Sequence, residues 1–280
     1  MKKDRTKTVP TVLSIAGFDG SGGAGIQADT KTISALGCYA MNVLTALPVQ
    51  NTQGVRKIYE IPTQAVYDQL DTIFDDKLPD AVKIGMVHSV DLVQTISRFL
   101  KDYNGHIVFD PVMVSTSGHR LIREDTIQAC IEELFPLATL ITPNLDEVGV
   151  LIGRPVETVE EMHAAGDELL ELNLRAVLVK GGHLHLDTLT SLLKRKDRTT
   201  KAFHSSRIDT QNTHGSGCTL SSAIASFLAR NRSLDEAVEL ALEYVFEAIK
   251  TGRDLSIGKG NGPLNHFHNP QKLITHDVDN

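Results

Sequence analysis

The sequence predicts an α/β fold in which one domain contains a mostly parallel β-sheet flanked by helices. Short apolar runs alternate with longer amphipathic stretches along the 280 residues, and most of these runs are apolar throughout. No Pro-, Gly- or Ser-rich linker divides the chain. Strands covered on both faces are continuously apolar, and their alternation with helices implies parallel strands joined by right-handed crossovers.

The elements are predicted in order from this alternation. Strands are expected at Thr11–Ala16, Asn42–Val49, Ala81–Ile84, His106–Phe109, Thr139–Thr142 and Ala176–Lys180. Helices are expected at Gly25–Leu36, Thr63–Phe74, Ser89–Tyr103, Arg123–Leu134 and Val159–Leu172. A hairpin (Thr188–Leu193 and Thr199–His204) and two helices (Cys218–Arg230 and Leu234–Gly252) complete the domain. The domain is predicted to span residues 11–268, between an N-terminal extension (1–10) and a loose polar tail (269–280).

Composition excludes several classes of protein. The formal net charge of −7 is spread along the chain without a basic run, which argues against nucleic-acid binding. No apolar stretch is long enough for a signal peptide or a membrane span. The chain has three cysteines, Cys38, Cys130 and Cys218. Their odd number and wide spacing argue against a disulfide framework or a metal site. A soluble cytoplasmic protein is therefore expected.

A glycine-rich segment, Gly17–Gly25, follows the first predicted strand and leads into a helix. Glycines let backbone approach a ligand closely, and a helix start offers free N–H donors. Gly20, Gly22 and Gly25 match the dinucleotide pattern G-x-G-x-x-G, but no carboxylate occurs in Asn42–Asn51, which counts against NAD. The alternatives are ligand contact or a plain tight turn.

A second glycine-containing segment, Asn212–Cys218, leads into an apolar helix. Two glycines at a helix start form a nest of backbone donors that suits an oxyanion or a phosphoryl group in transit. The helix dipole is predicted to lower the thiol pKa of Cys218, so that a thiolate could take a proton from a substrate hydroxyl. The alternative is a small buried residue on the core face of the helix.

Polar side chains follow further strands at the carboxyl edge of the predicted sheet. Asp110 and Glu147 are carboxylates and Lys180 is a cation. Ligands of α/β sheets bind at this edge, and phosphoryl transfer uses carboxylates to hold Mg²⁺ and a lysine to offset phosphate charge. Each residue alone could be a helix cap or a surface charge, but together they indicate phosphoryl transfer.

Eight stretches of sequence together resemble one known family. They are AGFDGSGGAGIQAD (16–29), LTALPVQNTQGV (44–55), KIGM (83–86), FDPVM (109–113), LITPNLDE (140–147), VKGGH (179–183), NTHGSGCTLS (212–221) and GKGNGP (258–263). In this order they resemble the hydroxymethylpyrimidine/phosphomethylpyrimidine kinases of the ribokinase superfamily. The resemblance implies a ribokinase-like three-layer sandwich and two phosphoryl transfers at one site, in thiamine biosynthesis.

The resemblance also implies roles for residues. Cys218 would be the catalytic base, where most ribokinase-like enzymes have aspartate, and Gly215, Ser216 and Gly217 would form the anion hole. Gln50 would bind the pyrimidine edge, in a pocket lined by Asp29, Ala24, Met86 and Val112. Lys180 would lie along the ATP phosphates, near Asn144 and Thr213, and Asp110 and Glu147 would serve Mg²⁺. The family is usually homodimeric.

Three positions, Phe18, Gly20 and Pro48, depart from the family pattern near the expected substrate pocket. They affect substrate identity rather than the phosphate machinery. A pyridoxine or pyridoxal kinase is therefore an alternative, and an NAD-dependent oxidoreductase or a non-catalytic binding module represents a different class. The polar segment Ser115–Arg120 is the candidate for a loop that closes over the site.

Overall fold

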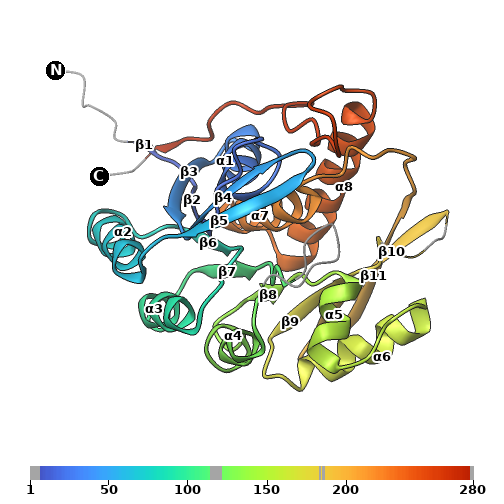
Figure 1. Ribbon diagram of the computed structural model, residues 1–280, viewed down its shortest axis with the longest axis horizontal. Coiled ribbons are helices and arrows are strands. Elements are labelled where there is room, and N and C mark those ends of the chain that lie inside the picture. The colour runs from blue at the N-terminus through green and yellow to red at the C-terminus, as the bar shows by residue number, and fades with distance from the viewer. Residues whose placement is uncertain (1–6, 114–121, 183, 185–186, 278–280) are drawn as a thin grey trace.

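The computed structural model describes residues 7–113, 122–182, 184 and 187–277. It has three layers, with helices on both faces of a central sheet (Figure 1). One face is covered by α1 (Gly25–Ala35), α7 (Ser216–Ala229) and α8 (Leu234–Gly252). The other is covered by α2 (Thr63–Asp76), α3 (Val90–Leu100), α4 (Glu124–Ala129), α5 (Leu145–Ile152) and α6 (Val159–Leu170). The predicted α/β fold is confirmed.

The central sheet has eight strands. Across it lie, in order, β11 (Thr200–Ser206), β10 (Thr188–Arg195), β9 (Ala176–Lys180), β8 (Leu140–Ile141), β7 (His106–Phe109), β6 (Ala81–Ile84), β2 (Thr11–Ala16) and β3 (Tyr39–Leu44). The strands from β9 to β3 run parallel, and the β10–β11 hairpin is antiparallel to them. β3 lies on one side of β2, and β6, the next strand of this sheet along the chain, lies on the other side of β2. The strand order therefore reverses between β2 and β6. A crevice at such a reversal is the usual ligand site.

Strand residues alternate between two apolar clusters. Leu13 and Ile15 of β2 pack into the cluster under α2–α6, whereas Val12 packs into the cluster under α1, α7 and α8. Two polar residues interrupt this second cluster. Ser14 of β2 and Lys83 of β6 are register partners, and both are fully buried. They lie at the strand-order reversal, where the site is expected.

The predicted strand Asn42–Val49 is wrong as one element. The chain leaves the sheet after β3 at Thr45, whose N–H donates to the Ala16 carbonyl, and continues as β4 (Ala46–Asn51). β4 pairs with β5 (Gly54–Glu60) in a separate two-stranded sheet. The sequence stays apolar beyond Thr45 because this hairpin also needs an apolar inner face. Composition therefore does not mark where β3 ends and β4 begins.

Helix boundaries differ from the predictions in three places. α5 was not predicted, the helix expected from Arg123 to Leu134 is α4 followed by a π-helical turn (Cys130–Leu134), and α7 begins at Ser216. The expected closing segment Ser115–Arg120 lies outside the described residues.

The segment after residue 268 is not a loose tail over its described part. The N–H of Gln271 donates to the Ala35 carbonyl and that of Ile274 to the Gly37 carbonyl, at the end of α1. β12 (His276–Asp277) then pairs antiparallel with β1 (Lys7–Thr8). Polar composition concealed this docking because it uses backbone hydrogen bonds.

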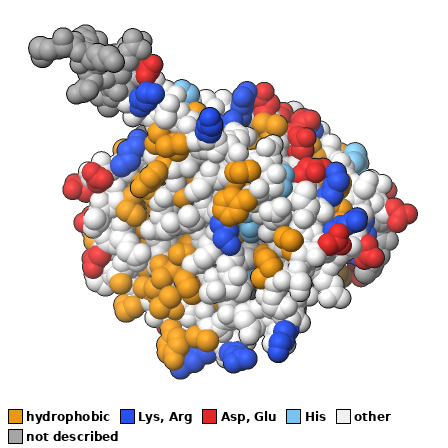
Figure 2. Space-filling model, turned by 90° about the horizontal axis from the view of Figure 1, so that it is seen from above, with side chains coloured by type: hydrophobic (Ala, Val, Ile, Leu, Met, Phe, Trp, Pro, Cys, Tyr) orange, Lys and Arg blue, Asp and Glu red, His pale blue; other side chains and the backbone are white. Residues whose placement is uncertain are grey.

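The surface carries mixed charges. On the face that Figure 2 shows, Lys and Arg side chains are scattered among acidic and hydrophobic ones, without one basic patch. In the described part of the chain, no helix is both long and apolar enough to cross a lipid bilayer.

Candidate active site

Most of the predicted site residues lie at the carboxyl edge of the sheet and at the start of α7, whereas Asp29 lies within α1 and Gln50 within β4. Two glycine-containing loops meet there in close contact. Gly215 precedes α7 with φ of 83°, and a Cβ on it would lie 1.7 Å from the carbonyl oxygen of Gly23. A Cβ on Gly25 would lie 2.2 Å from the Gly17 oxygen. These glycines are therefore required by close backbone approach, as well as by left-handed φ angles.

An aspartate and a histidine join the two loops. The Asp19 carboxylate accepts hydrogen bonds from the N–H groups of Ser21, Gly23 and Ala24. Nε2 of His214, the residue before Gly215, lies 2.9 Å from the same carboxylate. Burial opposes ionisation, but the hydrogen bonds led by that of His214 hold the pKa of Asp19 well below its usual range. The first loop is thus fixed against the second.

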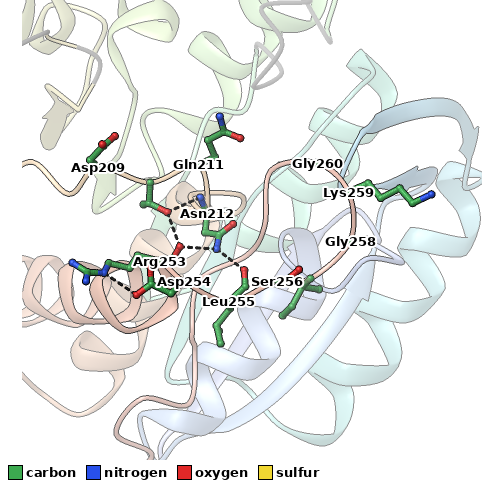
Figure 3. Close-up of a pocket in the computed structure, with 12 residues that line it drawn as sticks. Asp209, Gln211, Asn212, Arg253, Asp254, Leu255, Ser256, Gly258, Lys259 and Gly260 are labelled. Carbon is green, nitrogen blue, oxygen red and sulfur yellow. Dashed lines mark hydrogen bonds and ion pairs between the residues drawn. The ribbon is translucent and has the colours of Figure 1, made fainter.

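Asn212 fixes the second loop from its other side, beside a cavity of about 380 Å³ (Figure 3). Its Nδ2 donates to the carbonyls of Gly252, Arg253 and Leu255, at the end of α8 and beyond. The loop after α8 also contacts the β4–β5 hairpin, because the N–H of Gly260 donates to Thr52 Oγ1. The segments around the start of α7 therefore support one another.

The structure brings together Asp110, Lys180 and Gly217, the last of which was expected in the anion hole. Lys180 Nζ lies 3.1 Å from Asp110 Oδ1, and Thr142 Oγ1 donates to the same oxygen at 3.0 Å. A Cβ on Gly217 would lie 3.4 Å from both Asp110 Oδ2 and Lys180 Nζ. Burial lowers the pKa of Lys180, but Asp110 and Glu147 outweigh it, so the pKa is raised and the ammonium stays charged. The predicted meeting of these residues at the sheet edge is observed.

Glu147 and Asn144 form a capping box at the start of α5. Glu147 Oε2 accepts the N–H of Asn144 at 2.8 Å, and Asn144 Oδ1 accepts the N–H of Glu147 at 2.9 Å. Burial raises the pKa of Glu147 to about 7, Lys180 opposes this rise, and the negative charge of Asp110 adds to it. Two nearby buried carboxylates of like charge form an environment that favours a divalent cation.

Cys218 occupies the first turn of α7, and its sulfur accepts a hydrogen bond from the N–H of Gly25. The prediction that the helix start lowers its pKa is wrong for the free protein. Burial raises the pKa of the thiol to about 11, and the partial opposition of Lys83 does not cancel this effect. Desolvation of the thiolate therefore outweighs the helix dipole.

Asp29, which was expected to line the substrate pocket, is fully buried. Its carboxylate contacts Lys83 Nζ at 2.8 and 3.0 Å and accepts hydrogen bonds from the hydroxyls of Ser14 and Ser222. These protein donors engage both of its oxygens. Asp29 therefore supports the floor of the site from within the core.

The other expected substrate residues lie around this floor. Gln50 is half-buried on the same side of β4 as Ala46 and Pro48. Met86 follows β6, with its carbonyl bound by Thr45 Oγ1, and a Cβ on Gly17 would meet its sulfur at 3.7 Å. The remaining expected residues, Ala24, Val112 and Thr213, are half-buried in the surrounding loops.

Sequence reasoning missed Asp19, His214 and Lys83. Lys83 carried a usable signal, because a lysine within the apolar strand Ala81–Ile84 must be buried and must have a partner. Asp19 and His214 are polar residues in glycine-rich loops, where side-chain partners 195 positions apart cannot be read from one sequence.

Comparison with known families gives a clear match. A family model described as phosphomethylpyrimidine kinase matches residues 19–265. The hydroxymethylpyrimidine/phosphomethylpyrimidine kinase of Rhizobium meliloti (strain 1021) is 46% identical over 257 residues, which cover 91% of this chain and 96% of that protein. The match includes both glycine loops and the polar residues at the sheet edge.

Solved structures resemble the chain as well. The phosphomethylpyrimidine kinase of Clostridium difficile 630 superimposes with a TM-score of 0.76 and 42% identity, covering 86% of this chain and 99% of that one. The pyridoxal kinase of Staphylococcus aureus in complex with AMP-PCP superimposes with a TM-score of 0.86 and 30% identity, covering 97% and 100%. The fold is thus shared by kinases of two different ring alcohols.

Proposed function

Because the chain belongs to the phosphomethylpyrimidine kinase family, we propose how its residues carry out phosphoryl transfer. The protein is a phosphotransferase that uses ATP to phosphorylate hydroxymethylpyrimidine and then the resulting monophosphate, in thiamine biosynthesis. The observation that supports this mechanism best is the position of Cys218. It lies at the start of α7, beside Gly217, where an added Cβ would lie 3.4 Å from both Asp110 and Lys180.

In the proposed step, the thiolate of Cys218 takes the proton of the substrate hydroxymethyl group. The hydroxyl oxygen then bonds to the γ-phosphorus of ATP, and the bond from that phosphorus to ADP breaks. The N–H groups of Gly215 and Gly217 would receive the charge of the phosphoryl oxygens in transit, and that of Ser216, which donates to the Thr213 carbonyl in the free protein, would turn to join them. Lys180, which remains charged, offsets the negative charge of the ATP phosphates, with Asn144 and Thr213 beside it.

Asp110 and Glu147 are proposed to hold Mg²⁺. Their carboxylates fit this ion, since Mg²⁺ is usually bound by one or two carboxylates together with water and substrate phosphates. When bound, the ion would offset charge that develops on the transferred phosphate. Asn144 keeps Glu147 in place, because the capping box fixes the carboxylate at the start of α5.

The pyrimidine is proposed to bind between the β4–β5 hairpin and the start of α1. Gln50 would hydrogen-bond the ring edge, with Ala24, Met86 and Val112 as pocket walls and Asp29 beneath them. A flat neutral heterocycle suits such an apolar pocket with few polar groups. Pro48 lies on the inner side of the hairpin, and a Cβ on Gly20 would lie 3.3 Å from the Phe18 ring.

Substrate choice between hydroxymethylpyrimidine and pyridoxal tests this assignment. With ATP and Mg²⁺, we expect kcat/KM for the pyrimidine to exceed that for pyridoxal by at least about tenfold, the gain of one or two well-placed ring contacts. Initial rates and mass spectrometry of the products measure the ratio. Pyridoxal phosphate as the main product would retain the kinase activity and overturn the substrate, implicating Phe18 and Pro48.

A homodimer is also proposed, with the β4–β5 hairpin at its interface. Leu47, Val49, Val55 and Tyr59 of this hairpin are exposed by 39 to 51%. The hairpin pairs with no strand of the central sheet, so this apolar group is uncovered in one chain. A second copy is the partner we propose, because an isologous contact covers the same patch on both subunits.

Replacing Tyr59 and Val49 together with aspartate is expected to convert the dimer to a monomer. Light scattering after gel filtration would then give the chain mass of 30.6 kDa in place of twice that value. Leu78→Asp, at a residue 58% exposed outside the hairpin, is the control and should leave the dimer intact. A dimer that survives the double substitution would contradict this interface.

A cytoplasmic location completes the proposal, since Cys38, Cys130 and Cys218 are free thiols.

A further inference from the structure

A buried ion pair lies beneath Cys218, and the reaction as described above does not use it. Lys83 and Asp29 both have no solvent exposure, and the ammonium lies 2.8 and 3.0 Å from the carboxylate oxygens. Burying two charges carries a large desolvation cost, and apolar residues of similar volume are often equally or more stabilising. Its presence in the core therefore indicates a function other than stability.

The contacts of the pair place it against the second turn of α7, directly after the turn that contains Cys218. Asp29 accepts the hydroxyl of Ser222 at 2.7 Å, and Ser222 lies one helical turn after Cys218. Lys83 extends toward the carboxyl edge of the sheet, since a Cβ on Gly85 would lie 2.8 Å from Nζ. The ammonium thus reaches from the sheet toward the reacting end of the helix.

Charged groups face Cys218 from four elements of the fold. Lys83 on β6 lowers the pKa of the thiol, whereas Asp29 on α1 and Asp110 after β7 raise it. Lys180 at the end of β9 also interacts with the sulfur, although it is held by Asp110. Of these charges, that of Lys83 has the largest effect on the pKa of the Cys218 thiol. The thiol in turn raises the pKa of Lys83.

We propose that Lys83 is a positioning residue that provides the counter-ion for the thiolate of Cys218, and that Asp29 holds Lys83 in place. This inference rests on the proposed role of Cys218 as the base. Before proton transfer, the ammonium of Lys83 is shared by the Asp29 carboxylate and the thiolate. Once the sulfur has taken the hydroxyl proton, the ammonium remains neutralised by Asp29, so no unpaired charge is left in the core.

Alkylation of Cys218 by iodoacetamide tests this inference in the free protein, between about pH 7 and pH 9. Only the thiolate reacts with iodoacetamide. A higher thiol pKa lowers the thiolate fraction but makes the thiolate more nucleophilic, so a rise of one unit in pKa slows the reaction by about threefold. Lys83→Met is expected to slow the reaction by at least this factor, and Asp29→Asn to accelerate it. Peptide mass spectrometry distinguishes Cys218 from the buried Cys38 and Cys130.

The opposite signs separate this role from a structural one. Loss of packing would expose the sulfur and accelerate alkylation in both variants, and that result would overturn the proposal, as would an unchanged rate in Lys83→Met. Lys83→Arg retains the charge and should restore most of the rate. If Lys83→Met does not fold, the double variant Lys83→Met/Asp29→Asn removes both charges and should still react more slowly than the unmodified protein. Because no ATP or alcohol is present, the result is independent of whether the proposed kinase reaction occurs.

Discussion

Replacing Cys218 with alanine is expected to lower kcat by about 10²- to 10⁴-fold, the usual contribution of a general base. Alanine fills nearly the same space at the start of α7, so the anion hole and the Asp110–Lys180 pair should persist. ATP binding, measured by calorimetry with a non-hydrolysable analogue, should therefore change little. The rate measurement is ADP release in the presence of the pyrimidine alcohol.

The pH dependence gives this prediction a second readout. Burial raises the pKa of the Cys218 thiol to about 11. Below this pKa, each increase of one pH unit raises the thiolate fraction about tenfold. In the unmodified protein, kcat/KM should therefore still increase with pH above the Glu147 pKa of about 7, and this part of the slope should disappear in the alanine variant. Turnover that is unchanged by the substitution would remove Cys218 from the mechanism.

Replacing Gly215 with alanine is expected to lower kcat by at least about 10²-fold, the effect of removing one oxyanion donor. Its φ of 83° disfavours any side chain, and the added Cβ would overlap the Gly23 carbonyl. Relief of this overlap must separate the two glycine loops, which displaces the N–H groups of the anion hole. A lower urea midpoint of unfolding is expected in the same variant.

Gly153→Ala is the matched control for this substitution. Gly153 has a φ of 75°, but a Cβ there would have no atom within 4 Å. The variant should lose only about 1 to 2 kcal/mol, the cost of a left-handed conformation in a residue with a side chain, and it should retain its kcat. If Gly215→Ala behaved like this control, the close contact of the two loops would not matter for catalysis.

Much of the fold was predictable because its signals are local. The continuously apolar runs marked the parallel strands, and the first helix was found from its glycine-rich start and from Gly37 at its end. The chemistry at the sheet edge was predictable for a topological reason. Parallel strands end at one edge, so Asp110 and Lys180 had to lie at the same edge of the sheet, and they meet because only β8 separates their strands.

The errors arose where long-range contacts decide the structure. The strand predicted at Asn42–Val49 divides at Thr45, because the chain pairs with β2 before this residue and with β5 after it. The rise in the Cys218 pKa depends on burial, which a helix-dipole argument does not include. The α5 helix was predictable, since Asn144 and Glu147 have the spacing of a capping box, but a helix cap at Glu147 was considered without Asn144 and led to no predicted helix.

The central claim is that one site performs both phosphoryl transfers, and a time course of products tests it most directly. The purified protein is incubated with ATP, Mg²⁺ and hydroxymethylpyrimidine alone, and samples are analysed by mass spectrometry. The monophosphate should rise first and then decline as the diphosphate accumulates, and Gly215→Ala, which displaces the anion hole shared by the two transfers, should slow both steps. A monophosphate that accumulates without any diphosphate, or a diphosphate step that Gly215→Ala leaves unchanged while the first step slows, would contradict a single site.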